Sequence, residues 1–395
     1  GQRVQAYATE RRQRDGSATP RPGPVIIAGV MTGTSMDGID VALCSIEPAS
    51  EGDRQTIALL ASVTAPYPAE LRWLIDRALQ GQASMEELSD LPYFLARAYA
   101  DVLMEMPNWN HVQAVGVHGQ TLWHHPPVST WQAVSGTALA EYLGVPVVYD
   151  FRASDVAHGG QGAPLVPRFD HTFLGSPEEH RAALNIGGMA NLTLLPADTS
   201  INQVRAFDTG PGNVLINALC EKTFGKRYDA GGSIARSGTI IDQAFSELRT
   251  HPFFFDDPPK STGREVFGPA MAEALYRRYA HPSVPSEDLV TTLTELTAWS
   301  VGDHLRRYQP DCQRVLVAGG GVHNTYLMER LAVHCGSAVV ESTTSVGIDP
   351  DAKEAMCFAW LAWRTLHRLP GNVPSVTGAR REVILGSVAG QPVVL

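Results

Sequence analysis

Apolar segments separated by short polar turns divide the chain into predicted elements from residue 25 onward. Residues 25–31 and 41–46 are apolar, and the turn between them, residues 32–40, is rich in glycine, hydroxyl and carboxylate side chains. This order predicts a β-hairpin, to which the apolar run 56–63 adds a third antiparallel strand. Apolar residues then recur at helical spacing over 69–79 and 85–106, which predicts two amphipathic helices.

The same order of segments recurs in the second half of the chain. Two apolar runs flank the glycine-rich turn 187–190, and a third run leads to Asp208. Further strands are predicted at 114–117, 145–149 and 314–318, and further helices at 137–143, 214–224, 239–249, 269–279, 286–308, 324–333 and 351–369. Because a β-meander followed by helices occurs twice, we expect an α/β fold duplicated into two lobes with a central cleft.

The predicted lobes combine separate parts of the sequence. We expect lobe I to comprise residues 25–153 and about 365–395, and lobe II to comprise residues 154–364. Residues 1–24 contain five Arg, two acidic residues and three Pro but no apolar stretch. They therefore predict a disordered N-terminal tail and no signal peptide, whose apolar core needs about 7–15 residues.

Composition narrows the classes of function. The 395-residue chain is 44% hydrophobic and 18% charged, as is normal for a folded soluble protein, and no apolar run approaches the ~20 residues of a membrane helix. A formal net charge of −10 argues against nucleic acid as the main partner. The five cysteines form no CxxC pair, so we expect buried, reduced thiols and no structural zinc site.

The turn at residues 32–40 carries the first candidate chemistry. Gly33 and Gly38 let the backbone approach a ligand closely, and backbone N–H groups and hydroxyls in such a turn suit a phosphate. Asp37 is a candidate to face Mg²⁺ through water, because Mg²⁺ prefers oxygen ligands and keeps several waters. An ordinary hairpin turn is the alternative. The segment is not a Walker A loop, because it has no Lys and a strand follows it.

A second candidate, Asp208, lies where a predicted strand ends and a Gly-Pro-Gly turn begins. A side chain at this place is suited to catalysis, because loops at strand ends hold functional groups over a cleft. A turn-stabilising Asx motif is an equally good interpretation of Asp-Thr-Gly. The residues of this segment alone leave both readings open.

Several motifs, taken in order, resemble those of one known family. The stretches that carry the resemblance are VMTGTSMDGID at 30–40, HGQT at 118–121, DFR at 150–152, GGQGAPLVP at 159–167, NIGGMAN at 185–191, FDTGPGN at 207–213, KSTGRE at 260–265 and GGG at 319–321. Over about residues 25–388 the chain resembles anhydro-N-acetylmuramic acid kinase. Thr32, Met36 and Val117 depart from the residues common in the family, but none of these departures removes a chemical group that the reaction needs.

The resemblance implies a fold and an activity. The family belongs to the superfamily of sugar kinases, actin and heat-shock chaperone ATPases, so it implies a two-lobed actin-like, ribonuclease H-like ATPase fold. It also implies a bacterial cytoplasmic enzyme of cell-wall recycling. Such an enzyme converts 1,6-anhydro-N-acetylmuramic acid, ATP and water into N-acetylmuramic acid 6-phosphate and ADP, with Mg²⁺ accompanying the nucleotide. Because the family is commonly dimeric, a homodimer is expected.

The resemblance also implies roles for individual residues on the nucleotide side. Asp208 corresponds to the general base of the family. The first phosphate turn comprises Gly33, Thr34, Ser35, Met36, Asp37, Gly38, Ile39 and Asp40. By analogy with the superfamily, Gly187, Gly188 and Asn191 form a second phosphate turn, for which close packing of two strands is the alternative. By the same analogy, Gly319, Gly320, Gly321 and Asn324 border the adenosine.

On the sugar side, His118, Gln120 and Thr121 follow a strand end and are candidates to bind sugar hydroxyls, with a structural role as the alternative. Asp150 and Arg152 suit either a buried ion pair or a clamp on the sugar, and an Arg fork suits the lactyl carboxylate. Asp155 is a further candidate sugar contact. Lys260 and Arg264 are either surface charges or groups that close over the substrate.

Other activities remain as alternatives. A kinase for another anhydro-sugar, such as levoglucosan, would use the same chemistry but would need no Arg for a carboxylate. A nucleotide-switched binding protein would need neither Asp208 nor the motif at 118–121. A regulatory pseudokinase is disfavoured because both phosphate turns are intact.

Overall fold

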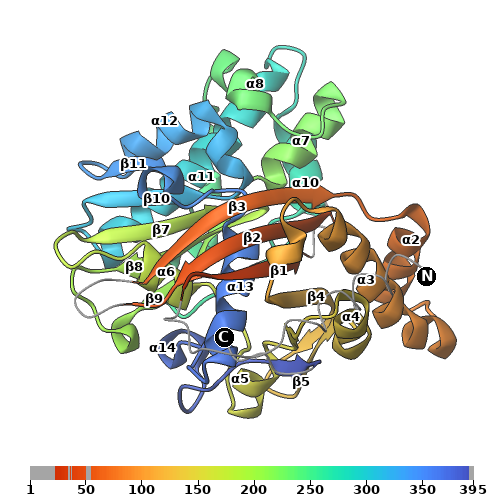
Figure 1. The fold of residues 1–395 in the computed structure, drawn as a ribbon. Coiled ribbons are helices and arrows are strands. Elements are labelled where there is room, and N and C mark those ends of the chain that lie inside the picture. The colour runs from red at the N-terminus through yellow and green to blue at the C-terminus, as the bar shows by residue number, and fades with distance from the viewer. Residues whose placement is uncertain (1–22, 34–35, 37, 50–54, 391–395) are drawn as a thin grey trace. The chain divides into compact units, whose positions relative to one another are not determined.

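The computed structural model describes residues 23–33, 36, 38–49 and 55–390, and the chain divides into two compact units (Figure 1). Unit 1 holds the chain up to Phe173 and from Ala352 onward, and unit 2 holds Leu174–Asp351. The expected boundaries at 153/154 and 364/365 differ from these, because residues 154–173 and the last long helix both belong to unit 1. Within the described part of the chain, no helix is both long and apolar enough to span a bilayer.

Unit 1 is built on one mixed sheet. Three strands form the antiparallel meander that the sequence predicts: β1 (Val25–Thr32), β2 (Ile39–Glu47) and β3 (Thr56–Ala65). On the other side of β1, β4 (Ala114–His125) and β6 (Val147–Tyr149) continue the sheet in parallel. The edge strand β12 (Ser387–Ala389) pairs with β6, and β5 (Ser129–Ala133) forms a hairpin with β4.

Helices cover both faces of this sheet. The residues of α2 (Ala69–Leu79), α3 (Met85–Glu105) and α4 (Gly136–Leu143) share a hydrophobic core with the even-numbered residues Ala28 and Val30 of β1. The neighbouring residue Gly29 faces the opposite side, where α13 (Lys353–Leu366) packs, since successive strand residues alternate between faces. This double coverage explains why β1 is almost entirely buried.

Two glycines let α13 approach the sheet closely. Gly29 of β1 and Gly116 of β4 are register partners in the parallel pair. A Cβ on Gly29 would overlap the carbonyl oxygen of Ala355, and one on Gly116 would overlap that of Phe358. The backbone of α13 therefore lies where side chains would otherwise stand, and this contact places the first turn of α13 beside the central strands.

Unit 2 repeats the same strand topology. Its meander comprises β7 (Arg181–Ile186), β8 (Met189–Leu195) and β9 (Arg205–Pro211), and β10 (Arg314–Ala318) and β11 (Val339–Ser342) extend β7 in parallel. The order β11-β10-β7-β8-β9 matches β6-β4-β1-β2-β3 of unit 1 strand for strand. This correspondence confirms the predicted duplication of a ribonuclease H-like α/β fold.

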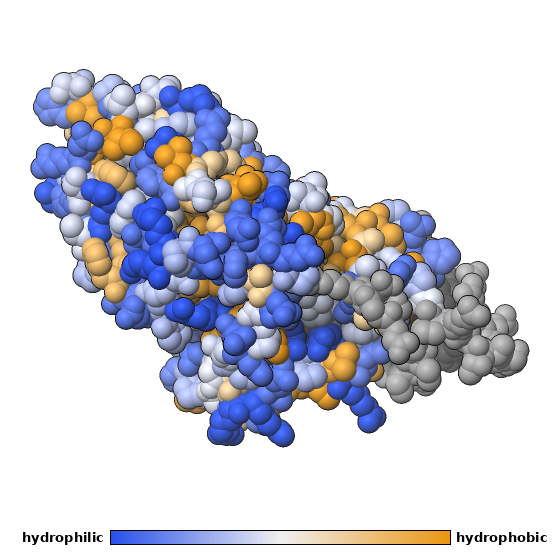
Figure 2. Space-filling view, turned by 90° about the vertical axis from the view of Figure 1, so that its left-hand side faces the viewer, coloured by the Kyte–Doolittle hydropathy of each residue, from blue (hydrophilic) through white to orange (hydrophobic). Residues whose placement is uncertain are grey.

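The helices of unit 2 enclose two hydrophobic cores. One core lies among helices and includes Phe254 and Phe267, and the other joins α11 and α12 to the sheet through Val301 and Leu327. The helices are α7 (Val214–Phe224), α8 (Ser233–Ser237), α9 (Asp242–Leu248), α10 (Pro269–Tyr279), α11 (Ser286–Tyr308) and α12 (Thr325–His334). Figure 2 shows a face of the molecule on which hydrophilic residues predominate, with hydrophobic patches among them.

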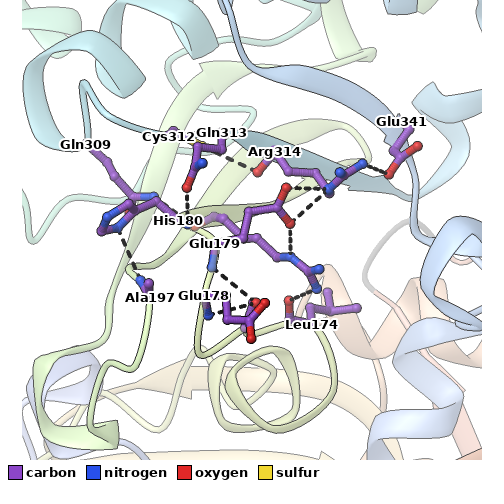
Figure 3. A network of polar contacts seen from close by, with 12 residues as sticks. Leu174, Glu178, Glu179, His180, Ala197, Gln309, Cys312, Gln313, Arg314 and Glu341 are labelled. Atoms are coloured by element: carbon purple, nitrogen blue, oxygen red, sulfur yellow. Dashed lines mark hydrogen bonds and ion pairs between the residues drawn. The ribbon is translucent and has the colours of Figure 1, made fainter.

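An ion-pair network closes the amino-terminal end of the parallel strands of unit 2 (Figure 3). Glu179 accepts hydrogen bonds from Nε of Arg181 at 2.6 Å and from Nε of Arg314 at 3.0 Å, and Arg314 also pairs with Glu341. The hydrogen bonds from the two arginines hold the pKa of Glu179 below its usual range. This end of the sheet is therefore stabilised by charge, whereas the candidate site residues lie at the carboxyl ends of the strands.

Candidate active site

The first glycine turn joins β1 to β2, as the sequence predicts. Met36 has a positive φ of 53°, and its N–H donates to the carbonyl oxygen of Gly33 at 3.2 Å. A Cβ on Gly38 would lie 2.8 Å from the carbonyl oxygen of Ala65, so only glycine fits there. Three residues with predicted roles, Thr34, Ser35 and Asp37, lie outside the described residues, and the roles predicted for them stay predictions.

The strand residues on either side of this turn are held by other parts of unit 1. Ile39 is entirely buried, and the Asp40 carboxylate accepts a hydrogen bond from the Thr64 hydroxyl at 2.5 Å. Thr32, the last residue of β1, donates from its hydroxyl to the carbonyl oxygen of Gly119 at 2.8 Å and contacts the Tyr99 hydroxyl at 3.0 Å. The turn is thus attached to β4, which runs past the strand end predicted at residue 117 and carries the predicted sugar contacts at 118–121.

The motif at 118–121 forms part of β4, and its polar groups have partners inside the protein. Gln120 is entirely buried and accepts a hydrogen bond from the Tyr67 hydroxyl at 2.8 Å. Thr121 accepts one from Gln132 at 3.3 Å. Both side chains therefore have the structural contacts that the sequence analysis left as an alternative.

His118 and Arg152 contact each other directly. Nε of Arg152 donates to Nε2 of His118 at 2.9 Å, and Nδ1 of His118 lies 2.7 Å from the carbonyl oxygen of Gly119. Nη1 of Arg152 donates to the carbonyl oxygen of Gly162 at 2.7 Å. Burial and the neighbouring Arg152 charge lower the pKa of His118 to about 3, so this imidazole is neutral at physiological pH.

The two aspartates near Arg152 have different environments. Asp150, with a positive φ of 57°, is half-buried, and burial raises its pKa; between these two described residues no ion pair links Asp150 to Arg152. Asp155 is entirely buried, and its carboxylate accepts hydrogen bonds from Gly162 N at 2.7 Å, Thr377 Oγ1 at 2.7 Å and Asn372 Nδ2 at 2.8 Å. These three hydrogen bonds give the Asp155 carboxylate a structural role within unit 1, which differs from the sugar contact expected for Asp155.

One charged residue near this region was not identified from the sequence. Glu354 lies in the first turn of α13, in a segment that the sequence indicates only as an amphipathic helix. Its side chain is exposed on the surface, but the protein around it partly desolvates the carboxylate and, with the negative charge of Asp40, raises its pKa, against the charges of Lys353 and Arg152. Only the packing of α13 on β1 and β4 brings Glu354 within electrostatic range of those residues.

In unit 2, the second glycine turn joins β7 to β8. A Cβ on Gly187 or Gly188 would meet no atom closer than 3.9 Å, so close packing does not explain these two glycines. The carbonyl oxygens of the turn are bound from α7, since Gly188 O accepts from Val214 N at 3.1 Å. Asn191 is the register partner of Asp208 on the adjacent strand β9, which places both side chains on the same face of the sheet.

A distant segment holds Asp208 from two sides. The N–H of Asp208 donates to the carbonyl oxygen of Lys260 at 3.1 Å, and its Oδ2 accepts from the N–H of Thr262 at 2.9 Å. Among the described residues its carboxylate has no hydrogen bond from its own turn, so the structure does not form the Asx motif that was the alternative. Burial raises the pKa of Asp208 to about 6, against the opposing effects of the Thr262 N–H and the Lys260 charge.

Lys260 is itself constrained beside this carboxylate. Its ammonium donates to the carbonyl oxygen of Phe253 at 2.7 Å and lies 4.4 Å from the centre of the Phe253 ring. Burial and the charge of Arg307 lower its pKa to about 8. The Thr262 hydroxyl is buried without a hydrogen-bond partner in the described part of the chain, so the segment beside Asp208 offers a free polar group.

The third glycine segment follows β10. Gly319 has φ +84°, and a Cβ there would lie 2.7 Å from the carbonyl oxygen of Ile186, whereas a Cβ on Gly320 would meet nothing within 4 Å. A Cβ on Gly321 would contact the Ile186 side chain at 2.5 Å. Asn324 caps α12, because its Oδ1 accepts from Leu327 N at 2.9 Å.

A glycine pair at 231–232, which the sequence analysis did not single out, lies beside this cap. Gly231 accepts a hydrogen bond from the Thr325 hydroxyl at 2.7 Å, and a Cβ on Gly232 would overlap Oδ1 of Asn324. The signal in the sequence is the Gly-Gly pair two residues after Asp229.

Several solved structures are similar to this chain at low sequence identity. Among solved structures, similar chains include an activator of 2-hydroxyisocaproyl-CoA dehydratase from Clostridium difficile with bound ADPNP, at 12% identity and a TM-score of 0.39, covering 86% of this chain and 97% of that one. A ROK family glucokinase from Streptomyces griseus has 12% identity and a TM-score of 0.36, covering 85% and 97%. A ROK hexokinase from Thermus thermophilus has 12% identity and a TM-score of 0.34, covering 86% and 100%.

The match to a family model is of a different kind, because it concerns the sequence over nearly its whole length. The model described as anhydro-N-acetylmuramic acid kinase matches residues 25–391, a span that contains every motif and every candidate site residue described above. The chain belongs to the anhydro-N-acetylmuramic acid kinase family.

Proposed function

We propose that this kinase opens the 1,6-anhydro ring of 1,6-anhydro-N-acetylmuramic acid with water while it transfers the γ-phosphoryl group of ATP to O6. The products are N-acetylmuramic acid 6-phosphate and ADP, which places the reaction in the recycling of cell-wall sugars. The observation that carries the proposal is the environment of Asp208, a half-buried carboxylate with a pKa of about 6 held by residues 260–262.

Asp208 is the proposed general base. It removes a proton from the water that attacks the anomeric carbon, as a carboxylate does in inverting glycoside hydrolysis. The bridging oxygen O6 leaves the anomeric carbon and forms its new bond to the γ-phosphorus of ATP, so no second acid is needed to protonate it. A pKa of about 6 suits this role, because the carboxylate is unprotonated at pH 7 and still basic enough to accept a proton.

The glycine turns are proposed to hold the nucleotide. Turns after β1 and β7 offer backbone N–H groups to the phosphates, and residues 319–321 with the cap Asn324 border the adenosine. The described residues contain no group of three or more His, Cys, Asp or Glu side chains placed to hold a metal. Mg²⁺ is commonly bound by phosphates, waters and one or two carboxylates. Asp37 is the proposed carboxylate, and the ion would neutralise phosphate charge.

Arg152 is the residue proposed to distinguish N-acetylmuramic acid from simpler anhydro-sugars. Two of its N–H groups are already bound by His118 and Gly162, which fixes the guanidinium, and the remaining N–H groups suit the lactyl carboxylate. A kinase for levoglucosan is the second candidate function, and it would derive no benefit from this fixed cation. We also propose a cytoplasmic homodimer, as the family resemblance implies.

Isotope labelling tests the coupled reaction. In ¹⁸O-water with ATP, the label should appear in the C1 hydroxyl of the product, and the ester oxygen at C6 should stay unlabelled because it is the former bridge oxygen. Mass spectrometry of the product and of its phosphate locates the label. Label in the phosphate ester, or rapid ring opening without ATP, would show that hydrolysis and phosphorylation are separate steps and would refute the proposal.

A further inference from the structure

A chain of hydrogen bonds in unit 1 leads from Asp155 to Thr32. The Asp155 carboxylate binds the N–H of Gly162, whose carbonyl oxygen accepts from Nη1 of Arg152. Nε of Arg152 then donates to His118, whose other ring nitrogen meets the carbonyl oxygen of Gly119. The Thr32 hydroxyl donates to the same oxygen. Arg152 is the member of this chain with the most donors, since a guanidinium carries five N–H groups.

The hydrogen-bond partners of His118 define its tautomer. A guanidinium N–H can only donate, so Nε2 of His118 must be the acceptor. A carbonyl oxygen can only accept, so the proton must be on Nδ1. Both ring nitrogens are therefore used within the protein, the side chain is 2% exposed, and the ring lies 4.9 Å from that of Phe358. His118 has no free polar atom for a ligand.

The other end of Arg152 is fixed as firmly. Gly162 has a φ of +67°, and a Cβ there would lie 2.8 Å from Val156, so the loop conformation depends on glycine. Its N–H is bound by the buried Asp155 carboxylate, which Thr377 also contacts from the C-terminal part of unit 1. The Gly162 carbonyl oxygen that orients Nη1 of Arg152 therefore belongs to a buried residue, which a hydrogen bond to Asp155 holds in place.

From this geometry we propose that His118 is a positioning residue for substrate recognition: as a neutral Nδ1–H imidazole it fixes Nε of Arg152, so that Nη2 and the second N–H of Nη1 meet the carboxylate of the sugar substrate. The inference rests on the proposed function and refines it, because the sequence left His118 open between a direct contact to sugar hydroxyls and a structural role. Correct orientation of a bidentate Arg clamp contributes strongly to binding, since a small misplacement weakens both hydrogen bonds at once.

Two substitutions of His118 separate the acceptor at Nε2 from the donor at Nδ1. In His118→Gln the amide oxygen reaches the position of Nε2 and still accepts from Arg152, whereas in His118→Asn the shorter amide reaches only the position of Nδ1. We expect His118→Asn to raise KM for the anhydro-sugar about 10–100-fold, while His118→Gln stays within about threefold of wild type. KM for ATP should be unchanged in both variants, and a thermal melt of each verifies folding.

A neutral substrate provides the matched control. The methyl ester of the lactyl group cannot form the charge-assisted pair with Arg152, so wild type and His118→Asn should turn it over with similar KM. In addition, the double variant His118→Asn with Arg152→Lys should be no worse than Arg152→Lys alone, because the imidazole acts only through that guanidinium.

The outcomes distinguish this inference from the proposed function. A wild-type enzyme that does not phosphorylate the anhydro-sugar would refute the proposed function and, with it, this inference. An active wild-type enzyme whose His118→Asn variant loses as much on the neutral ester as on the acid, or whose double variant shows multiplied losses, would overturn the inference alone. Either result would mean that His118 contacts the sugar or supports the fold generally.

Discussion

The proposed base, Asp208, shows how one side chain acquires its properties from a segment distant in sequence. Its backbone N–H and its carboxylate are both bound by residues 260–262. Burial raises the pKa of the carboxyl to about 6, while the Lys260 charge and the Thr262 N–H oppose this rise. The basicity of Asp208 is therefore set by a balance that substitutions can shift in either direction.

Replacing Asp208 by Asn should abolish turnover and leave nucleotide binding intact. The amide keeps the shape of the side chain but cannot accept the proton of the attacking water, and loss of one positioned base typically costs about 10²–10⁴-fold in rate. Rate measurements with the anhydro-sugar, together with calorimetric titration of ATP, check both parts. Turnover at the wild-type rate would exclude Asp208 as the base.

The pH dependence of the reaction should report the same carboxyl. Because the base must be unprotonated, kcat/KM should fall as pH decreases through the pKa of about 6. In Lys260→Met the nearby positive charge is removed, so the anionic form of Asp208 is less favoured and the acidic limb should move to higher pH. The exposed Lys226→Met is the control and should leave the limb in place. A limb that moves to lower pH in Lys260→Met would contradict this account of the site.

At the scale of elements, close approach of one helix to two strands organises unit 1. Gly29 and Gly116 are register partners, and α13 packs its backbone against both. The same contact brings Glu354, in the first turn of α13, into electrostatic range of Asp40 and Arg152. Helix packing therefore positions charged groups as well as the core.

The substitution Gly29→Ala tests this packing. The added Cβ would overlap the carbonyl oxygen of Ala355, which is backbone and has no rotamer to change. Overpacking of a core typically costs about 1–3 kcal/mol, so the free energy of unfolding in urea should fall by at least that amount. Gly23→Ala is the matched control, because a Cβ there meets nothing within 4 Å. Equal stability of the two variants would show that α13 can move away from the sheet at little cost.

At the scale of the whole molecule, the two units differ in how they are encoded. Unit 2 is one continuous segment, Leu174–Asp351, whereas unit 1 needs two segments that are far apart in the sequence. The second of these carries α13, which covers one face of the sheet of unit 1, and β12, which pairs with its edge strand. The two units therefore share a topology, but only unit 2 is expected to fold without the rest of the chain.

A fragment of residues 174–351 should therefore fold alone, because its sheet and both of its cores are complete. A fragment of residues 1–351 should contain a folded unit 2 and a poorly folded unit 1, since it lacks α13. Thermal unfolding followed by circular dichroism, and protection of backbone amides from hydrogen exchange, measure this difference, with the full-length chain as reference. Cooperative folding of residues 1–173 within the fragment of residues 1–351 would contradict the expectation.

Local patterns were sufficient for the long elements and their order, but they did not predict the short strands β5, β11 and β12. Alternation of apolar runs and glycine turns predicts both meanders, because a strand–turn–strand signal depends only on neighbouring residues. Apolar spacing also predicts helices such as 269–279 and 286–308, which the structure has as α10 and α11 with the same bounds. The recurrence of this order was enough to predict the duplicated α/β fold.

The candidate site was determined only in part by the sequence. Family motifs select Asp208, His118 and Arg152, and Asp155 lies between two of them, but the motifs do not distinguish a ligand contact from a buried structural group. That distinction depends on burial and on hydrogen bonds between residues far apart in the chain, such as Asp155 with Asn372 and Thr377. Glu354 was missed for the same reason, since its neighbours Asp40 and Arg152 lie on other strands and loops.

The sequence by itself therefore determined which segments form the long strands, the long helices and the glycine turns, because these follow from short-range patterns of apolarity and backbone freedom. The tertiary structure decided which polar residues find their hydrogen-bond partners inside the protein, which tautomer His118 adopts and how strongly the pKa of Asp208 is raised. Desolvation and hydrogen bonding act between atoms close in space, and distance in space between residues such as Asp208 and Thr262 is fixed only when the chain has folded.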